Sequence, residues 1–100
     1  MRIVGSFKLP EFWESKPHFR DAQGTLEAWS AETKKADWKN PMEIKKLYRS
    51  ASILKGGVVV FNIKGNDYRL VTKINYPLGV VEIRFVGDHR AYDKINAEEV

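Results

Sequence analysis

The sequence predicts a single α+β domain, residues 1–100, in which helices pack on one face of a mainly antiparallel sheet. Two observations lead to this class. Hydrophobic residues recur at helical spacing before residue 50 and at alternating positions after residue 57. In addition, a chain of 100 residues with 43% hydrophobic composition has the size of one compact domain with one core.

Residues 2–5 are expected to form a first strand, and a helix follows that ends near Lys16. Either Ser6 caps this helix and Pro10 lies in its first turn, or the helix starts at about Pro10. The next helix is the clearest, because its buried residues repeat at steps of three and four and form one stripe. These residues are Phe19, Ala22, Leu26, Trp29, Thr33 and Ala36.

A third helix, short and basic, is expected over residues 41–48. Asn40 has the side chain of a helix cap, Pro41 fits the first helical position, and Glu43 stands where a capping-box carboxylate belongs. Residues 50–57 are rich in turn-forming residues and are expected to connect this helix to the sheet.

Three strands are expected over residues 58–64, 67–75 and 80–86. Gly65-Asn66 is a two-residue hairpin signal, and residues 76–79 form a four-residue loop. Together these turns predict a register that pairs Lys64 with Asp67, Asn62 with Arg69, Lys73 with Glu82, and Val71 with Arg84.

This register sorts the strand residues onto two faces. The apolar face, which the helices should cover, contains Val59, Phe61, Ile63, Tyr68, Leu70, Ile74, Val81, Ile83 and Phe85. The polar face contains Asn62, Lys64, Arg69, Lys73, Glu82 and Arg84. Gly87 is expected to end the last strand, and Asp88 to cap a short helix that contains His89, Tyr92 and Ile95.

The net charge is +4, and it is unevenly distributed. Residues 34–55 hold seven basic and two acidic side chains, which favours binding to a polyanion such as nucleic acid. On charge alone, a solvated helix face that aids solubility is the more ordinary explanation of this segment. The RNA-binding candidates in and beyond this segment are Lys45, Lys46, Lys55, Asn62, Lys64 and Lys73, although Lys73 is first expected to pair with Glu82.

Arg69 and Arg84 are the strongest candidates for chemistry, because cations on neighbouring strands repel unless an anion binds between them. Two guanidinium groups could hold one phosphodiester and stabilise charge that develops in a transition state. His89 follows the strand of Arg84 and could transfer protons at neutral pH. Tyr92 lies three residues later and either stacks on a base or closes the core.

Several classes of function lack the residues they need. The chain has no cysteine, its two histidines are 71 positions apart, and it contains no phosphate-binding glycine loop, so we expect no metal and no cofactor. No apolar run approaches the roughly 18 residues of a membrane span, and a cytoplasmic protein that does not contact a membrane is expected. Trp13 and Trp29 are expected in the core, whereas Trp38 has no evident assignment.

Several stretches together resemble one known family. Residues 60–71 read VFNIKGNDYRLV and residues 83–87 read IRFVG, followed by His89 and Tyr92-Asp93; upstream stand EFWE at 11–14, KKADW at 34–38 and SASI at 50–53. These segments resemble the HigB toxins of toxin–antitoxin systems, which belong to the RelE-like superfamily. Asp88 departs from the threonine that usually precedes the motif histidine, and Ala91 from a frequent acid.

The resemblance implies a RelE-like fold and a metal-independent endoribonuclease that cleaves messenger RNA, commonly on the translating ribosome, and arrests growth. It implies an antitoxin partner with a helix-turn-helix domain, through which the complex contacts operator DNA. Arg69, Arg84, His89 and Tyr92 match the polar motif residues of the family. The alternative is a non-enzymatic module of the same fold that binds RNA or targets a protein.

Overall fold

A five-stranded mixed sheet forms the centre of the molecule in this computed structural model, which describes residues 1–100. The strand order is β1-β5-β4-β3-β2, and β1 pairs parallel with β5 while all other neighbours are antiparallel. The strands are β1 (Arg2–Val4), β2 (Ser52–Ile53), β3 (Val58–Ile63), β4 (Tyr68–Asn75) and β5 (Val80–Asp88). The expected α+β class with a mainly antiparallel sheet is confirmed.

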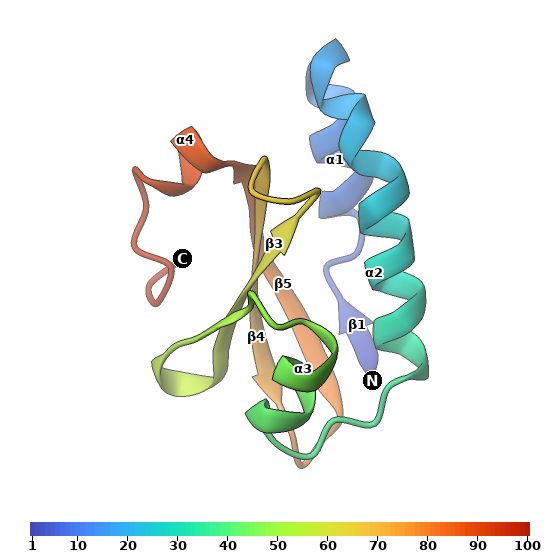
Figure 1. Ribbon diagram of the computed structural model, residues 1–100, viewed down its shortest axis with the longest axis vertical. Helices are drawn as coiled ribbons and strands as arrows, with labels where there is room; N and C mark the ends of the chain where they lie inside the picture. The colour runs from blue at the N-terminus through green and yellow to red at the C-terminus, as the bar shows by residue number, and fades with distance from the viewer.

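The N-terminal helices form a layer beside the sheet (Figure 1). They are α1 (Lys8–Ser15), the 3-10 helix η1 (Pro17–Ala22) and α2 (Gln23–Lys35). Pro10 lies in the first turn of α1, where its missing N–H costs no hydrogen bond. The Ser6 side chain does not cap this helix, which begins after Phe7 without a side-chain cap. The expected cap is therefore wrong, although the helix itself is present. No helix combines the length and hydrophobicity that crossing a membrane requires.

Helix α3 (Pro41–Leu47) begins as its sequence predicts. The Asn40 Oδ1 atom accepts a hydrogen bond from the Glu43 N–H at 3.1 Å, and Pro41 occupies the first turn. The Glu43 carboxylate reaches back to the Lys39 N–H at 2.6 Å, one residue before the position of an ordinary capping box. These contacts fix the point at which the chain turns toward the sheet.

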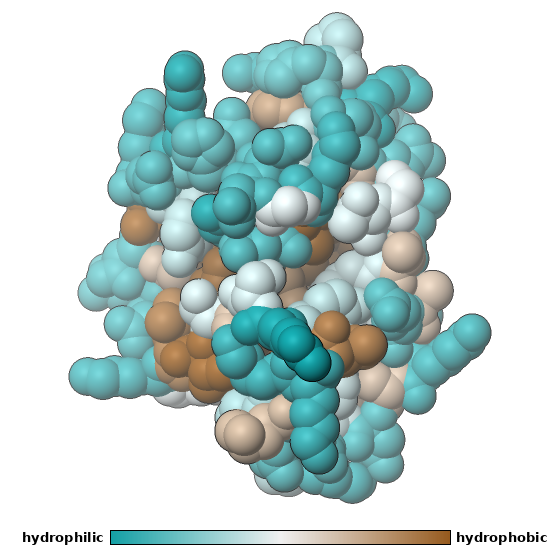
Figure 2. All heavy atoms as spheres, viewed as in Figure 1, coloured by the Kyte–Doolittle hydropathy of each residue, from teal (hydrophilic) through white to brown (hydrophobic).

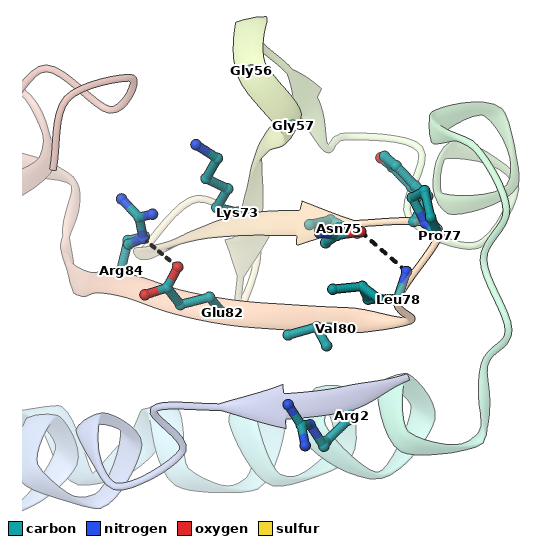
Figure 3. A pocket seen from close by; sticks show the side chains of 12 residues that line it. Arg2, Gly56, Gly57, Lys73, Asn75, Pro77, Leu78, Val80, Glu82 and Arg84 are labelled. Carbon is teal, nitrogen blue, oxygen red and sulfur yellow. Dashed lines mark hydrogen bonds and ion pairs between the residues drawn. The ribbon is translucent and has the colours of Figure 1, made fainter.

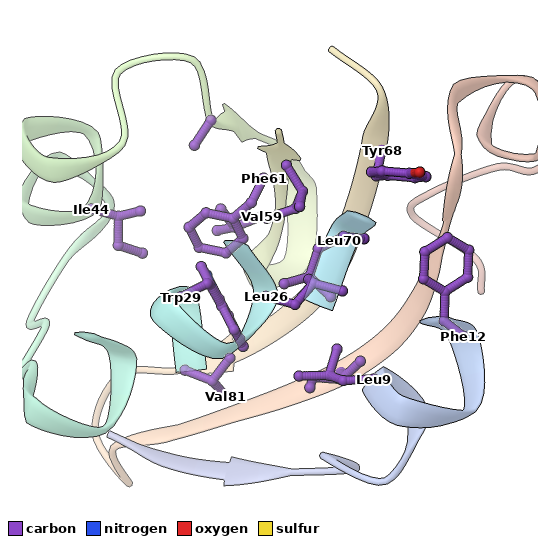
Figure 4. Packing of buried hydrophobic residues seen from close by; sticks show 14 of the residues in the cluster. Leu9, Phe12, Leu26, Trp29, Ile44, Val59, Phe61, Tyr68, Leu70 and Val81 are labelled. Carbon is purple, nitrogen blue, oxygen red and sulfur yellow. The ribbon is translucent and has the colours of Figure 1, made fainter. Parts of the chain in front are cut away.

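The main core lies between the helices and the first face of the sheet, by which we mean the face that α1 and α2 cover (Figure 4). Leu26 and Trp29 of α2 pack there against strand residues such as Phe61 and Leu70. Trp38 is 5% exposed and its ring stacks at 6.3 Å on that of Phe61, so it is a core residue. Figure 2 shows that hydrophilic residues cover most of the face viewed there.

The connection expected over residues 50–57 contains a strand that its sequence did not predict. Strand β2 pairs Ser52 with Val60 and Ile53 with Val59 of β3, and the 3-10 helix η2 (Lys55–Gly57) follows it. A strand of two residues carries too short an alternation to be recognised. Its pairing is set by the neighbouring strand.

One residue of β5 lies outside the expected register. Asn62 pairs with Arg69 and Lys73 with Glu82 as predicted, but Val71 pairs with Phe85 and not with Arg84. A bulge between Val71 and Thr72 inserts one extra residue in β5. The bulge reverses the side-chain parity beyond it, so the prediction that Phe85 belongs to the main core is wrong.

The hairpin between β3 and β4 also differs from the prediction. Lys64 has a φ of 51° and Gly65 a φ of 66°, and Lys64 and Asp67 lie in the turn and not in the ladder. The turn directs the Lys64 ammonium to Asp21 of η1, at 2.7 Å. The expected place of Lys64 on the polar face is therefore wrong.

The opposite side of the sheet, which we call the second face, carries a smaller apolar cluster. Its buried members are Val58, Val60, Val71 and Ala97. Phe85, Tyr92, Ile95 and Val100 pack against it, so the C-terminal segment, residues 93–100, lies beside this face (Figure 1). The cluster makes the second face half apolar, where a polar face was expected.

Strand β5 runs through Gly87 to Asp88, so the expectation that Gly87 ends the strand is wrong. Helix α4 (His89–Tyr92) follows directly, and the Asp88 Oδ1 atom accepts from the Ala91 N–H at 2.9 Å. The predicted cap is thus confirmed. Ile95, expected in this helix, lies after its end.

Candidate functional site

Arg69 of β4 and Arg84 of β5 both lie on the second face. Arg69 approaches Tyr92, and Arg84 approaches Val100, and both of these residues pack on the second apolar cluster. Arg69 pairs with Gly87, which is three residues along β5 from Arg84, or about 10 Å at the usual rise of a strand. The two guanidinium groups therefore share a face of the sheet but start from positions that are separated along the strand direction.

Arg69 is only partly engaged by the protein. Its Nη1 atom donates to the carbonyl oxygens of Asn66 at 2.9 Å and Tyr68 at 3.2 Å. Its guanidinium carbon lies 5.8 Å from the centre of the Tyr92 ring, which is a cation–π distance. These contacts orient the guanidinium group and leave the rest of its planar donor set available for an anion.

Arg84 is held by two neighbours. Its Nε atom lies 2.8 Å from Glu82 Oε1, and its Nη1 atom donates to the Val100 carbonyl oxygen at 2.8 Å. The predicted ion pair of Lys73 with Glu82 is therefore wrong, since the Glu82 carboxylate binds Arg84 instead. A phosphate that binds Arg84 must share it with this carboxylate or displace it.

His89 begins α4 and is more than half exposed. Its backbone N–H donates to the Asp67 carbonyl oxygen at 3.3 Å, and the Nδ1 atom of its imidazole ring lies 4.0 Å from Asp93 Oδ2. It forms no hydrogen bond with Arg69 or Arg84. The structure thus brings Arg69 and Tyr92 into contact, places His89 on the same short helix as Tyr92, and leaves Arg84 farther along the face.

The six candidate RNA-binding side chains do not form one group. Lys45 donates to the carbonyl oxygens of Arg49 at 2.6 Å and Ala51 at 2.8 Å, so its ammonium group holds the backbone of the turn that follows α3. Asn62 donates to the Ser50 carbonyl oxygen at 3.5 Å. Three further candidates, Lys46, Lys55 and Lys73, are exposed, and their side chains form no hydrogen bond or ion pair.

Lys64 belongs to a polar group on the side of the helices. The Lys64 ammonium beside Asp21 holds the pKa of that carboxyl below its ordinary value of 3.8, and the Tyr68 hydroxyl, which donates to Asp21, acts in the same direction. Burial and the Asp21 carboxylate raise the pKa of Tyr68 to about 12. This group ties η1 to the start of β4.

Phe85 is a residue of the second face that sequence reasoning placed in the main core. A Cβ atom built on Gly87 would lie 2.6 Å from Phe85 Cζ, so the ring lies against the backbone of Gly87. Gly87 is the strand partner of Arg69. The position of the ring depends on the bulge, for which the sequence carries no evident signal.

A cavity of about 640 Å³ opens on the second face, on the side of Arg84 that faces away from Arg69 and toward the start of β5 (Figure 3). Lys73 and Arg84 line it together with Arg2 of β1 and the β4–β5 turn. The sequence did not single out Arg2, because the pairing of β1 with β5 is not a local signal. No group of three or more His, Cys, Asp or Glu side chains in the chain could hold a metal ion.

The helices that cover one face of the five-stranded mixed sheet give a compact α+β fold, which is consistent with a RelE-like toxin. The family model described as the HigB toxin, a RelE-like toxic component of a toxin–antitoxin system, matches residues 22–95. The chain belongs to this family. It is therefore the toxin component of a toxin–antitoxin system, and its partner is an antitoxin. A search of curated proteins gives no matching relative.

Proposed function

We propose that this toxin is an endoribonuclease that cleaves messenger RNA, without a metal, on the translating ribosome, and thereby arrests growth. The observation that supports it best is that Arg69 and Arg84 emerge on one face of the sheet, with Tyr92 in contact with Arg69 and His89 on the same short helix. Such a face can bind the phosphodiester backbone of a single RNA strand.

In the proposed reaction, the RNA 2′-hydroxyl attacks the adjacent phosphorus atom. His89 accepts the hydroxyl proton, the bond to the 5′-oxygen breaks, and a proton returned from the imidazole completes the leaving hydroxyl. The products are a 2′,3′-cyclic phosphate and a 5′-hydroxyl end. Arg69 and Arg84 stabilise the negative charge on the phosphorane, and Tyr92 keeps Arg69 in place and offers a ring on which a base can stack.

The remaining exposed cations of the basic segment, Lys46 and Lys55 among them, are proposed to dock on ribosomal RNA. Their positive charge is not neutralised by internal ion pairs. We further propose that the antitoxin carries a helix-turn-helix domain and that the complex contacts operator DNA only through it. We place the toxin in the cytoplasm, where its substrate lies.

The two histidines of the chain provide a matched test. His89→Ala should lower the cleavage rate of ribosome-bound messenger RNA by roughly 10²–10⁴-fold, the usual contribution of a general base. His18→Ala, an exposed histidine of η1, should leave the rate unchanged. An RNA with a 2′-deoxy sugar at the scissile position should resist cleavage, and equal cleavage of this RNA would overturn the mechanism.

A second candidate function is supported by the contacts of Arg84. Because Glu82 and Val100 already bind this guanidinium, the second face could act as a phosphate clamp without chemistry. In that case His89→Ala would remain as toxic as the wild type upon induced expression, with transcripts intact, whereas Arg84→Ala would lose toxicity because the clamp is removed. Loss of toxicity and of transcript fragments in both variants would favour the ribonuclease.

A further inference from the structure

Apart from Arg84, the residues that line the open cavity have no part in the chemistry proposed above. The cavity lies between the β4–β5 turn, η2 and the start of β1 (Figure 3). Its volume of about 640 Å³ falls within the range of roughly 300–1,000 Å³ that small-molecule sites occupy. The cavity can therefore hold a ligand that is larger than a single phosphate ion.

The cationic side chains of the cavity are in excess. Arg2, Lys73 and Arg84 line it with one carboxylate, that of Glu82, and this carboxylate is paired with Arg84. Arg2 and Lys73 are exposed, and neither side chain forms an ion pair or a hydrogen bond within the protein. An anion that enters the cavity meets two cations whose charge nothing else neutralises.

The apolar part of the cavity wall is formed by the β4–β5 turn and the start of β5, beside Arg2. Leu78 is 73% exposed, which is the largest exposure among the large hydrophobic residues of the chain. Its N–H donates to Asn75 Oδ1 at 3.1 Å, so the turn holds the leucine in position, and Pro77 and Val80 lie beside it. A flat apolar group that covers this wall would remove exposed hydrocarbon from water.

We propose that this cavity is a subsite for the nucleotide that flanks the scissile phosphate. Arg2 and Lys73 bind the phosphate of that nucleotide, and its base lies against Leu78 and Val80. Arg84 belongs both to the cavity and to the proposed reaction centre, so a strand that passes it enters the cavity directly. The proposal rests on the ribonuclease function and extends it to a residue of β1.

The first test measures binding of a short single-stranded RNA to the His89→Ala protein, in which cleavage cannot interfere. Adding Arg2→Ala and Lys73→Ala should weaken binding by roughly tenfold or more, since hydrogen bonds to charged groups are lost. The plot of log K against log salt should become shallower by about 0.7, which corresponds to the loss of one phosphate contact on single-stranded RNA. Lys16→Ala with Arg20→Ala removes the same charge from the other side of the molecule and should change neither quantity.

The second test examines the base. An RNA that lacks the base on one side of the scissile phosphate should bind the His89→Ala protein several-fold more weakly than the intact RNA. Adding Leu78→Asn should abolish this difference. If removal of neither flanking base weakens binding, or if the Arg2 and Lys73 variant behaves like its charge-matched control, the subsite is wrong.

The outcomes separate the two proposals. Wild-type protein that binds RNA through Arg2 and Lys73 but cuts no ribosome-bound messenger RNA would support an RNA-binding cavity and overturn the ribonuclease. Cleavage with an unchanged KM and kcat in the Arg2→Ala, Lys73→Ala protein would support the ribonuclease and overturn the subsite. If both hold, the double variant should raise KM and leave kcat within a few-fold of the wild type.

Discussion

The ring of Phe85 lies against the backbone of Gly87, so closely that a Cβ atom at residue 87 would come within 2.6 Å of the ring. Gly87 is also the residue that pairs with Arg69 across β4 and β5. A side chain at this position must therefore displace an aromatic ring on the candidate site. The glycine is needed for space, because its backbone is that of an ordinary strand.

Gly87→Ala should consequently disturb the second face more than the core. We expect a loss of stability of about 1–3 kcal/mol, the usual cost of overpacking, and a larger relative loss of RNA cleavage. The measurement is urea unfolding together with cleavage of a ribosome-bound transcript. Gly24→Ala, at an open position of α2, is the control and should stabilise the protein by up to about 1 kcal/mol. An alanine at 87 without effect on either quantity would show that the ring moves freely.

The ion pair of Asp21 with Lys64 predicts how stability depends on pH. The pKa of Asp21 is lowered by folding, so its contribution is complete above the ordinary value of 3.8 and disappears as the pH falls through the lower folded value. The pKa of Lys64 is raised, so its contribution disappears only in alkali, above its ordinary value of 10.5.

Urea midpoints of the wild type and Asp21→Asn should therefore differ at pH 7 and converge in strong acid. Asn can still accept from the Tyr68 hydroxyl, so the comparison isolates the charge. A difference that persists unchanged at pH 2 would contradict this assignment. Asp37→Asn, whose partner Lys39 is largely exposed like itself, should show little difference at any pH.

Two tyrosine hydroxyls should give opposite results when they are removed. The Tyr68 hydroxyl donates to Asp21, so Tyr68→Phe should cost about 1 kcal/mol. The Tyr76 hydroxyl is shielded from solvent and has no hydrogen-bond partner, and burial raises its pKa. Tyr76→Phe should therefore leave stability unchanged or increase it by about 1 kcal/mol, as thermal unfolding can measure. Equal destabilisation by both changes would mean that Tyr76 has a partner.

The helix caps allow a prediction in which sequence and structure disagree. Asn40 caps α3 with its side chain, so Asn40→Ala should cost about 1 kcal/mol of unfolding free energy. The hydroxyl of Ser6 caps nothing, so Ser6→Ala should cost almost nothing. A Ser6→Ala protein that loses as much stability as Asn40→Ala would restore the cap that the sequence alone predicts.

Local signals explain what could be predicted. Asn40, Pro41 and Glu43 specify the start of α3 within four residues, and the Gly65-Asn66 turn fixes the pairing of Asn62 with Arg69 even though its backbone differs from the expected type. Short-range patterns of this kind depend on neighbours in the sequence. The structures that they specify therefore form independently of how the rest of the chain packs.

Features that depend on distant residues could not be predicted. The bulge opposite Val71, the pairing of β2 with β3 and the covering of the second face by Ala97 and Val100 are set by tertiary packing. Arg84 nevertheless lies on the predicted face, because the extra residue of the bulge reverses parity only after it. The extra residue also places Phe85 on the second face, with its ring against Gly87, the strand partner of Arg69, where no pattern in the sequence had placed it.

Because of the bulge, the number of residues in β5 decides which of its side chains reach the main core and which reach the second face. Val81 and Ile83, which precede it, fill the main core, and Phe85, which follows it, joins the opposite cluster. Deletion of a paired residue of this strand, in contrast to deletion of the extra one, would exchange inner and outer positions beyond it and bury what now meets solvent. Insertions and deletions should hence be confined to the turns, while β5 keeps a constant number of residues.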